Sequence, residues 1–258
     1  MTESKSPRAG GILSADIAFP DQEGAARFYS RVLTSGENPL WGADLMNSRG
    51  APVIGVGAQS EEYAHLPLQW MPHIQVADVA RSVAQALALG GQELMHFKSD
   101  DGASQWAVIA DPNGAAFGLI PVIPVEMAPS ADGAGCISWC DLTVADAPAT
   151  CDFYKSVVGW SVEEVEMQDD GRGYADYCML DEGGNAAAGV CHARGVNADL
   201  PPVWLIYLPV GDLAESLRRV VQEGGAVIHS TRGGGEGYQY AVIRDPAGAH
   251  LALAPASS

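Results

Sequence analysis

The sequence predicts an α+β fold in which four βαβββ modules form two tandem halves. Two observations predict this fold. First, the closing motif Asp111-Pro112-Asn113-Gly114-Ala115 recurs 134 residues later as Asp245-Pro246-Ala247-Gly248-Ala249. Second, each half contains two runs in which a strand pattern is followed by a helix pattern and by further short strand patterns. A repeat of this length indicates duplicated structural units that share a core or a cleft.

The repeat extends well beyond the closing motif. The same offset places Trp70 on Trp204, whereas Phe28-Tyr29 matches Phe153-Tyr154 with an offset of only 125 residues. The nine-residue difference indicates one insertion in the second half, after its first helix. We expect the insertion to form an extra or lengthened edge strand that begins after Trp160.

The first module opens with an apolar run over Ile12–Phe19, which predicts a strand. Apolar residues then recur at helical spacing over Glu23–Leu33. Two short strands are expected next, at Ala43–Asn47 and at Val53–Ala58, because the turn signal Ser48-Arg49-Gly50 separates two apolar stretches.

The second module repeats this order. Its first strand is expected over Gln69–Val76, and Asp78 is placed to cap a helix that runs to Leu89 and ends at Gly90-Gly91. Three further strands are expected, at Gln92–His96, Gln105–Ala110 and Ala116–Pro121. In the second half, the two modules are expected over Ile137–Cys191 and Val203–Ala254.

These patterns set the expected domain boundaries. The first domain covers residues 1–122, a linker rich in Pro and Gly covers 123–135, and the second domain covers 136–258. At 258 residues the chain is long enough for two domains that each bury a core.

Composition limits the partners. The net charge of −18, from 14 basic and 32 acidic residues, argues against nucleic acid, because phosphate binding needs clustered Lys and Arg. The chain contains neither the apolar window of a membrane span nor a signal-peptide core, so we expect a cytoplasmic protein. Its five cysteines, with no C-x-x-C spacing, fit reduced thiols. The expected partner is a small-molecule ligand, and a homodimer is left open.

Three features together resemble a known family: the four modules, the Phe-Tyr pair on the first helix of each half, and the D-P-x-G-A ending. They resemble the glyoxalase/bleomycin-resistance/dioxygenase superfamily, also called the vicinal oxygen chelate proteins. The stretch from Trp139-Cys140-Asp141-Leu142-Thr143-Val144 to Gly159-Trp160 looks most like tandem glyoxalase-like proteins of the actinobacterial type. The resemblance covers nearly the whole chain and implies two tandem glyoxalase-like domains. It does not identify the reaction, because the superfamily includes lyases, isomerases, dioxygenases and drug-binding proteins.

The resemblance also bears on metal binding. Metal-dependent members carry a His or Gln in the first strand of a half and a Glu in its last strand. The matching positions here are Ser14 and Trp139 in the first strands, and Gly118 and Ala252 in the last strands. None of the four side chains offers the imidazole, carboxylate or thiolate that zinc and first-row ions prefer. We therefore expect neither a metal nor another cofactor.

Strand alternation indicates which side chains share a face with these positions. We expect the catalytic candidates to be His73, Asp141 and Asp16, with His73 as general acid or base and Asp141 as its orienting partner. The expected ligand-binding residues are Trp139, Tyr207, Met71, Thr143 and His250. Structural roles remain open for the Asp and His candidates, as does a relocated metal site built from His73, His250 and an Asp.

The sequence favours a protein that binds or transforms a small neutral or cationic organic molecule without a metal. Gln105 and Gln239 stand where related proteins often carry Arg, which makes an anionic ligand less favoured. Trp139 matches Ser14, so the two clefts are expected to differ, and the strand that faces Trp139 stays open. Two alternatives remain: a metal-dependent glyoxalase-type lyase or dioxygenase with a relocated site, and a non-catalytic scaffold.

Overall fold

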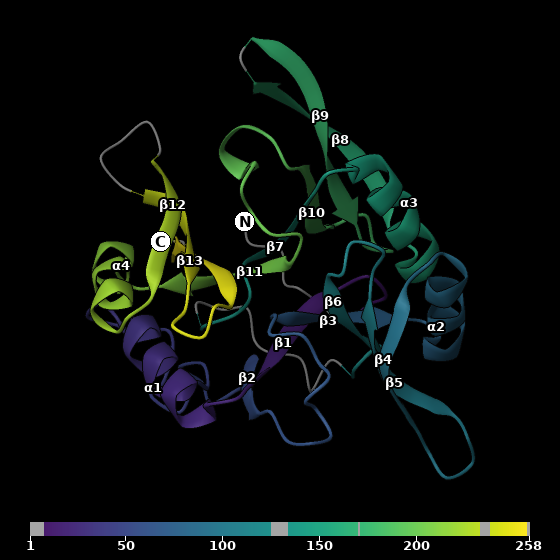
Figure 1. The fold of residues 1–258 in the computed structure, drawn as a ribbon, viewed down its shortest axis with the longest axis horizontal. Helices are drawn as coiled ribbons and strands as arrows, with labels where there is room; N and C mark the ends of the chain where they lie inside the picture. Colours follow the sequence, from purple (N-terminus) through teal and green to yellow (C-terminus); the bar gives the residue numbers. More distant parts are fainter. Residues whose placement is uncertain (1–7, 125–133, 170, 233–237, 257–258) are drawn as a thin grey trace.

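The computed structural model describes residues 8–124, 134–169, 171–232 and 238–256. The first half forms a six-stranded sheet and the second half an eight-stranded sheet (Figure 1). The first sheet contains β1 (Ile12–Phe19), β2 (Ile54–Ala58), β3 (Met71–Val76), β4 (Gln92–Lys98), β5 (Ser104–Ala110) and β6 (Ala116–Pro121), in the order β2-β1-β3-β6-β5-β4. The expected linker falls largely within 125–133, outside the described residues.

The second sheet repeats this order and adds two strands at one edge. It contains β7 (Trp139–Val144), β8 (Ser161–Asp169), β9 (Arg172–Leu180), β10 (Ala186–His192), β11 (Trp204–Val210), β12 (Ala226–Arg232), β13 (Tyr238–Arg244) and β14 (His250–Pro255), in the order β12-β13-β14-β11-β7-β10-β9-β8. The expected insertion is therefore confirmed as a strand, because β8 lies at the edge of the sheet and pairs only with β9. The α+β class with two tandem domains is likewise confirmed.

Four α-helices occur in the described residues, one in each module, and each begins at an aspartate. They are α1 (Gln22–Leu33), α2 (Val79–Ala88), α3 (Ala147–Val158) and α4 (Leu213–Gln222). The carboxylates of Asp21, Asp78, Asp146 and Asp212 each accept a hydrogen bond from a backbone N–H of the first turn. None of these helices is both long enough and apolar enough to cross a membrane.

Within each half the two modules join through their first strands. Strands β1 and β3 pair antiparallel, with Ser14 opposite His73, and β7 and β11 pair in the same way, with Trp139 opposite Tyr207. Because directly paired residues point to the same face of a sheet, this register decides which candidate side chains can meet.

The expectation of a strand at Ala43–Asn47 is wrong, so the first module is βαβ. Only an isolated bridge between Trp41 and Asn47 forms there. The matching stretch of the second half is nine residues longer and makes the β8–β9 hairpin, whereas the shorter segment 34–53 crosses to the second half. There the Trp41 indole N–H donates to the Pro209 carbonyl at 2.7 Å, and the Asn47 amide donates to the Gly135 carbonyl at 3.0 Å.

The repeated motifs join the two halves. Helix α1 packs on α4, and α2 packs on α3. The Tyr29 hydroxyl donates to Asp245 Oδ2 at 2.7 Å, and the Trp70 indole N–H donates to the Tyr29 oxygen at 3.3 Å. The second copy makes the same connection through Tyr154, which donates to Asp111 at 3.3 Å. One continuous buried core therefore contains residues of both halves.

Candidate functional site

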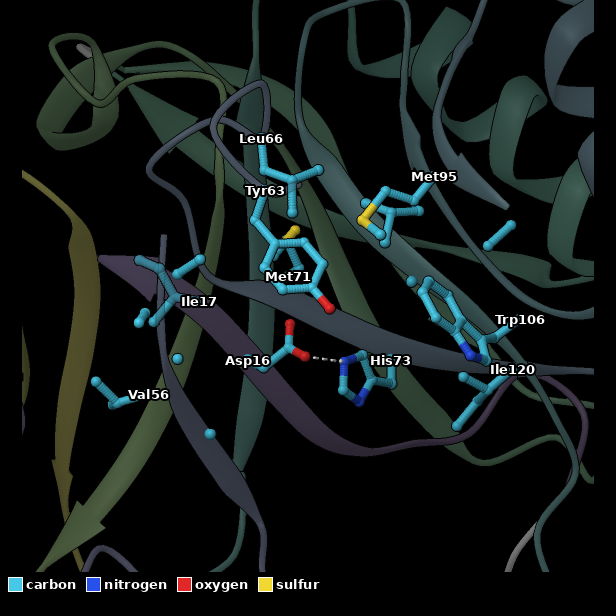
Figure 2. A pocket seen from close by; sticks show the side chains of 17 residues that line it. Asp16, Ile17, Val56, Tyr63, Leu66, Met71, His73, Met95, Trp106 and Ile120 are labelled. Carbon is cyan, nitrogen blue, oxygen red and sulfur yellow. Dashed lines mark ion pairs between the residues drawn. The ribbon is translucent and has the colours of Figure 1, made fainter. Parts of the chain in front are cut away.

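The first-half sheet carries a cavity of about 590 Å³ on one of its faces (Figure 2). Its walls are mainly apolar, and among the described lining residues only Asp16 and His73 carry a carboxylate or an imidazole. No Lys or Arg is among the described residues that line it. The larger lining side chains are Asp16, Ile17, Val56, Tyr63, Leu66, Met71, His73, Met95, Trp106, Val108 and Ile120.

His73 lies between two polar neighbours from β1. Its Nδ1 is 2.9 Å from the Ser14 hydroxyl, and its Nε2 is 3.3 Å from Asp16 Oδ2. A carboxylate can only accept, so a neutral His73 carries its proton on Nε2 and its Nδ1 accepts from Ser14. The imidazole then keeps no unshared acceptor for a ligand. The Asp16 side chain is 51% exposed, against 24% for His73, so Asp16 presents the more accessible polar group.

A glycine leaves room for the imidazole. Gly118 lies opposite His73 on β6, and a Cβ at position 118 would lie only 2.8 Å from His73 Cδ2. Glycine at position 118 therefore both removes the side chain expected of a metal-dependent relative and makes space for the His73 ring.

The remaining walls come from residues that the sequence did not single out. Tyr63 and Leu66 reach the cavity from the segment between β2 and β3, Met95 comes from β4 and Trp106 from β5 (Figure 2). The Trp106 ring stacks on exposed Phe97, with centroids 5.7 Å apart. Strand alternation along β5 is the sequence signal that indicates Trp106 and Val108, because it places them on the same face of the strand.

A second group of candidates meets on the second-half sheet. The Trp139 indole N–H donates to Asp141 Oδ1 at 2.6 Å, and the Tyr207 hydroxyl donates to Asp141 Oδ2 at 2.7 Å. The strand that faces Trp139 is therefore β11, through Tyr207, and not β3. Burial raises the pKa of the Asp141 carboxyl above its usual range, although the Tyr207 and Trp139 hydrogen bonds act in the opposite direction.

The candidates thus fall into two groups on different sheets. Asp16, His73 and Met71 line the first-half cavity, whereas Trp139, Asp141 and Tyr207 bond to one another in the second half. His73 has Asp16 and not Asp141 as its carboxylate neighbour. Thr143 is buried on β7. His250 is half-buried at the start of β14, where it lies opposite Arg244 of β13 in the strand register. Desolvation, with the nearby Arg244 charge, lowers the pKa of His250.

The donor set does not fit a divalent metal. The cavity offers one imidazole and one carboxylate, fewer than the three protein ligands of a catalytic zinc site. No group of three His, Cys, Asp or Glu side chains able to hold a metal occurs in the described part of the chain. His73 and His250 lie on different sheets, and neither belongs to a group of three such donors in the described residues, so the structure does not assemble the relocated site left open by the sequence.

Two matched glycines make the difference between the halves testable. Gly189 lies beside Asp141, and a Cβ there would lie 2.2 Å from Asp141 Oδ1, whereas a Cβ at the matching Gly55 would meet only Asp16 Cβ, at 3.3 Å. We expect Gly189→Ala to lower the free energy of unfolding by about 1–3 kcal/mol. The added methyl group would displace the Asp141 carboxylate, which two hydrogen bonds hold in place. Gly55→Ala should cost clearly less. Urea unfolding followed by circular dichroism measures both changes. Equal losses would contradict the conclusion that Asp141 is held more rigidly than Asp16.

The fold defines a class of protein in which βαβ-based modules pair within one sheet and recur in tandem. A model of the Glyoxalase/Bleomycin resistance protein/Dioxygenase superfamily matches residues 136–253, and a glyoxalase-like domain model matches residues 14–120. The chain belongs to this superfamily, as its sequence motifs indicated.

Relatives by sequence include proteins of Mycobacterium and Streptomyces. CFP32 of Mycobacterium tuberculosis is 30% identical over 120 residues, which is 46% of this chain and 45% of CFP32, so the match spans about half of that relative. The anthracycline biosynthesis protein DnrV of Streptomyces peucetius is 27% identical over 230 residues, covering 82% of this chain and 81% of DnrV.

Solved structures share the fold at low identity. A variant of homoprotocatechuate 2,3-dioxygenase from B. fuscum superposes with a TM-score of 0.56 at 14% identity, over 98% of this chain and 73% of that chain. A mutant of 4-hydroxymandelate synthase from Streptomyces coelicolor has a TM-score of 0.53 at 12% identity, over 98% and 94%. Such distant likeness shows the fold alone.

Proposed function

We propose that this protein binds a small neutral or cationic organic molecule in the first-half cavity and does so without a metal. The observation that carries the proposal is the cavity itself. It has a volume of about 590 Å³, apolar walls and one accessible carboxylate, and no Lys or Arg occurs among its described lining residues. Ligand pockets of this size typically combine apolar walls with a few polar groups that fix orientation. An anion would meet Asp16 with no cation to offset the repulsion.

Each polar residue has a separate role in this proposal. Asp16 accepts a hydrogen bond from an N–H or O–H of the ligand, because its side chain is the more exposed of the pair. His73 positions Asp16 and is itself held by Ser14. In a catalysed reaction, Asp16 would exchange a proton with the ligand, because it is the group next to the ligand. His73 would stabilise the charge on the Asp16 carboxylate.

The apolar part of the ligand would lie against the aromatic wall. Trp106 and Tyr63 offer ring faces inside the cavity, and Met71 and Met95 offer flexible thioethers that adapt to irregular shapes. These residues suit an aromatic or otherwise flat apolar body. They do not indicate a reaction, so the proposal extends only to binding and to proton movement by Asp16 and His73.

Three matched probes test the charge preference. We expect 2-naphthylmethylamine and 2-naphthylmethanol to bind and raise the melting temperature, and 2-naphthoate to fail. Asp16→Asn should weaken amine binding by about tenfold or more, because it removes a charge-assisted hydrogen bond. Titration calorimetry measures the affinities. The control is Asp141→Asn, which changes the matching carboxylate of the other half and should leave amine affinity unchanged. The proposal would be refuted if naphthoate bound more tightly than the amine, or if the two variants lost equal amine affinity.

Metal independence has its own test. We expect elemental analysis of protein purified without chelators to show far less than one transition metal per chain, since the cavity offers only two suitable donors. Near-stoichiometric zinc, nickel, iron or manganese that survives dialysis would instead favour a metal-dependent lyase or dioxygenase. Absence of any small-molecule binding would favour the scaffold alternative.

The remaining parts of the proposal concern setting and partners. We place the protein in the cytoplasm, where its five cysteines would stay reduced, and we assign it a small-molecule ligand and no nucleic acid. A homodimer is compatible with this assignment.

A further inference from the structure

The second-half sheet carries a polar cluster on the face that matches the first-half cavity. Strand pairing places His229 opposite Val242 on β13 and Thr231 opposite Tyr240. Val242 packs with Tyr207, so all of these side chains share one face. The ring centroids of Tyr207 and Tyr240 are 5.4 Å apart, and those of His229 and Tyr240 are 5.7 Å apart. Asp141 adjoins them through its hydrogen bond from Tyr207.

The repeat shows what has changed between the two faces. With the offset of 134 residues, Met95 matches His229, Trp106 matches Tyr240, and Phe97 matches Thr231. Three apolar or aromatic side chains that line or flank the first-half cavity are thus replaced by hydrogen-bonding ones. The two faces have diverged in polarity while keeping the same sheet order.

Two atoms of the cluster stand out. His229 Nε2 and Thr231 Oγ1 are buried and have no hydrogen-bond partner among the described residues. Burial also lowers the pKa of His229, so its imidazole is neutral near pH 7 and offers one donor and one acceptor. A buried polar atom left without a partner destabilises a fold, so its presence needs an explanation such as a ligand or ordered water.

We infer that this face is a second binding site, for a neutral hydroxyl-bearing molecule of the sugar or polyol class. A hydroxyl can donate and accept at once, which suits His229 together with the phenol groups of Tyr207 and Tyr240. Both oxygens of Asp141 already accept from Trp139 and Tyr207, so the carboxylate is less available to an ammonium group than Asp16 is. The half-exposed Trp139 indole adds an aromatic face for the apolar side of a sugar ring. This inference goes beyond the first-half cavity and does not depend on it.

The test uses methyl β-glucoside as probe and saturation-transfer NMR as readout. We expect saturation transfer with the wild-type protein, and a loss of at least about fivefold in both His229→Leu and Tyr207→Phe, each of which removes a hydrogen-bonding group. Met95→Leu, at the matching position of the first half, should leave the glucoside signal unchanged. No transfer with the wild-type protein, or a loss in Met95→Leu and not in His229→Leu, would overturn the inference.

Thermal unfolding without ligand separates binding from folding. If His229 serves a ligand, His229→Leu should melt at the same temperature as the wild type or higher, because it removes an unpartnered polar atom from a buried position. A lower melting temperature together with loss of the glucoside signal would show that His229 has a structural role, and would count against the site. The naphthyl probes report on the first-half cavity alone, so either site can fail while the other stands.

Discussion

Trp41→Ala should lower the free energy of unfolding by about 3–5 kcal/mol, the usual cost of deleting a buried Trp side chain. Trp41 is 1% exposed, although it lies in the segment that failed to form a strand. Its indole N–H bonds to Pro209 in the second half, and the backbone at Gly135 lies directly against its ring. The loss should therefore affect both halves at once. Urea unfolding followed by circular dichroism measures the change.

Two further variants sharpen the Trp41 test. Trp41→Phe keeps most of the apolar volume but leaves the Pro209 carbonyl without its indole donor, so its cost should be smaller than that of Trp41→Ala. Trp106→Ala removes the same side chain from the wall of the cavity, where it is only half-buried, and should cost clearly less than Trp41→Ala. If Trp106→Ala costs as much as Trp41→Ala, the segment 34–53 does not join the halves as the structure indicates.

Tyr29→Phe should lower the free energy of unfolding by about 2–4 kcal/mol. The change leaves two buried groups without their partner: Asp245 loses a donor at 2.7 Å, and the Trp70 indole N–H loses its acceptor. Each buried group left unpaired costs about 1–3 kcal/mol. Asp245 also accepts from the backbone N–H groups of the closing turn, so the turn itself should persist in this variant.

The second copy provides the matched control for Tyr29. Tyr154→Phe removes a longer contact, 3.3 Å to Asp111, so a smaller loss is expected. A double-mutant cycle with Tyr29→Phe and Asp245→Asn isolates the energy of the contact between the halves. Additive losses in that cycle, or a larger loss from Tyr154→Phe, would show that the Tyr29–Asp245 contact does not join the halves.

These contacts give the family motifs a structural meaning. The Phe-Tyr pair of each half lies against the D-P-x-G-A turn of the other, so the residues that carried the resemblance hold the halves together. They lie away from the cavity and from the polar cluster. For that reason, the motifs identify the family and the fold but leave the ligand undetermined.

Local patterns were sufficient for most of the elements. The aspartate caps and apolar spacings fix the four helices, and the insertion after α3 forms β8, because these features depend on residues close in sequence. The strand at Ala43–Asn47 failed for a different reason. That segment packs across the molecule because it donates hydrogen bonds to the carbonyl groups of Pro209 and Gly135. Both residues lie far away in the sequence, so local patterns do not reveal these contacts.

The sequence by itself determined the repeat and the family. Alternation along a strand requires no tertiary information, so the sequence also indicated which candidate side chains share a face of a strand. Only the tertiary structure decided how those residues are grouped. Strand pairing places His73 beside Asp16 and Ser14, and Tyr207 beside Trp139 and Asp141, so the expected site residues form two separate groups on different sheets. Hydrogen bonding and burial between distant strands set which carboxylate stays accessible, and neither follows from the order of residues along one strand.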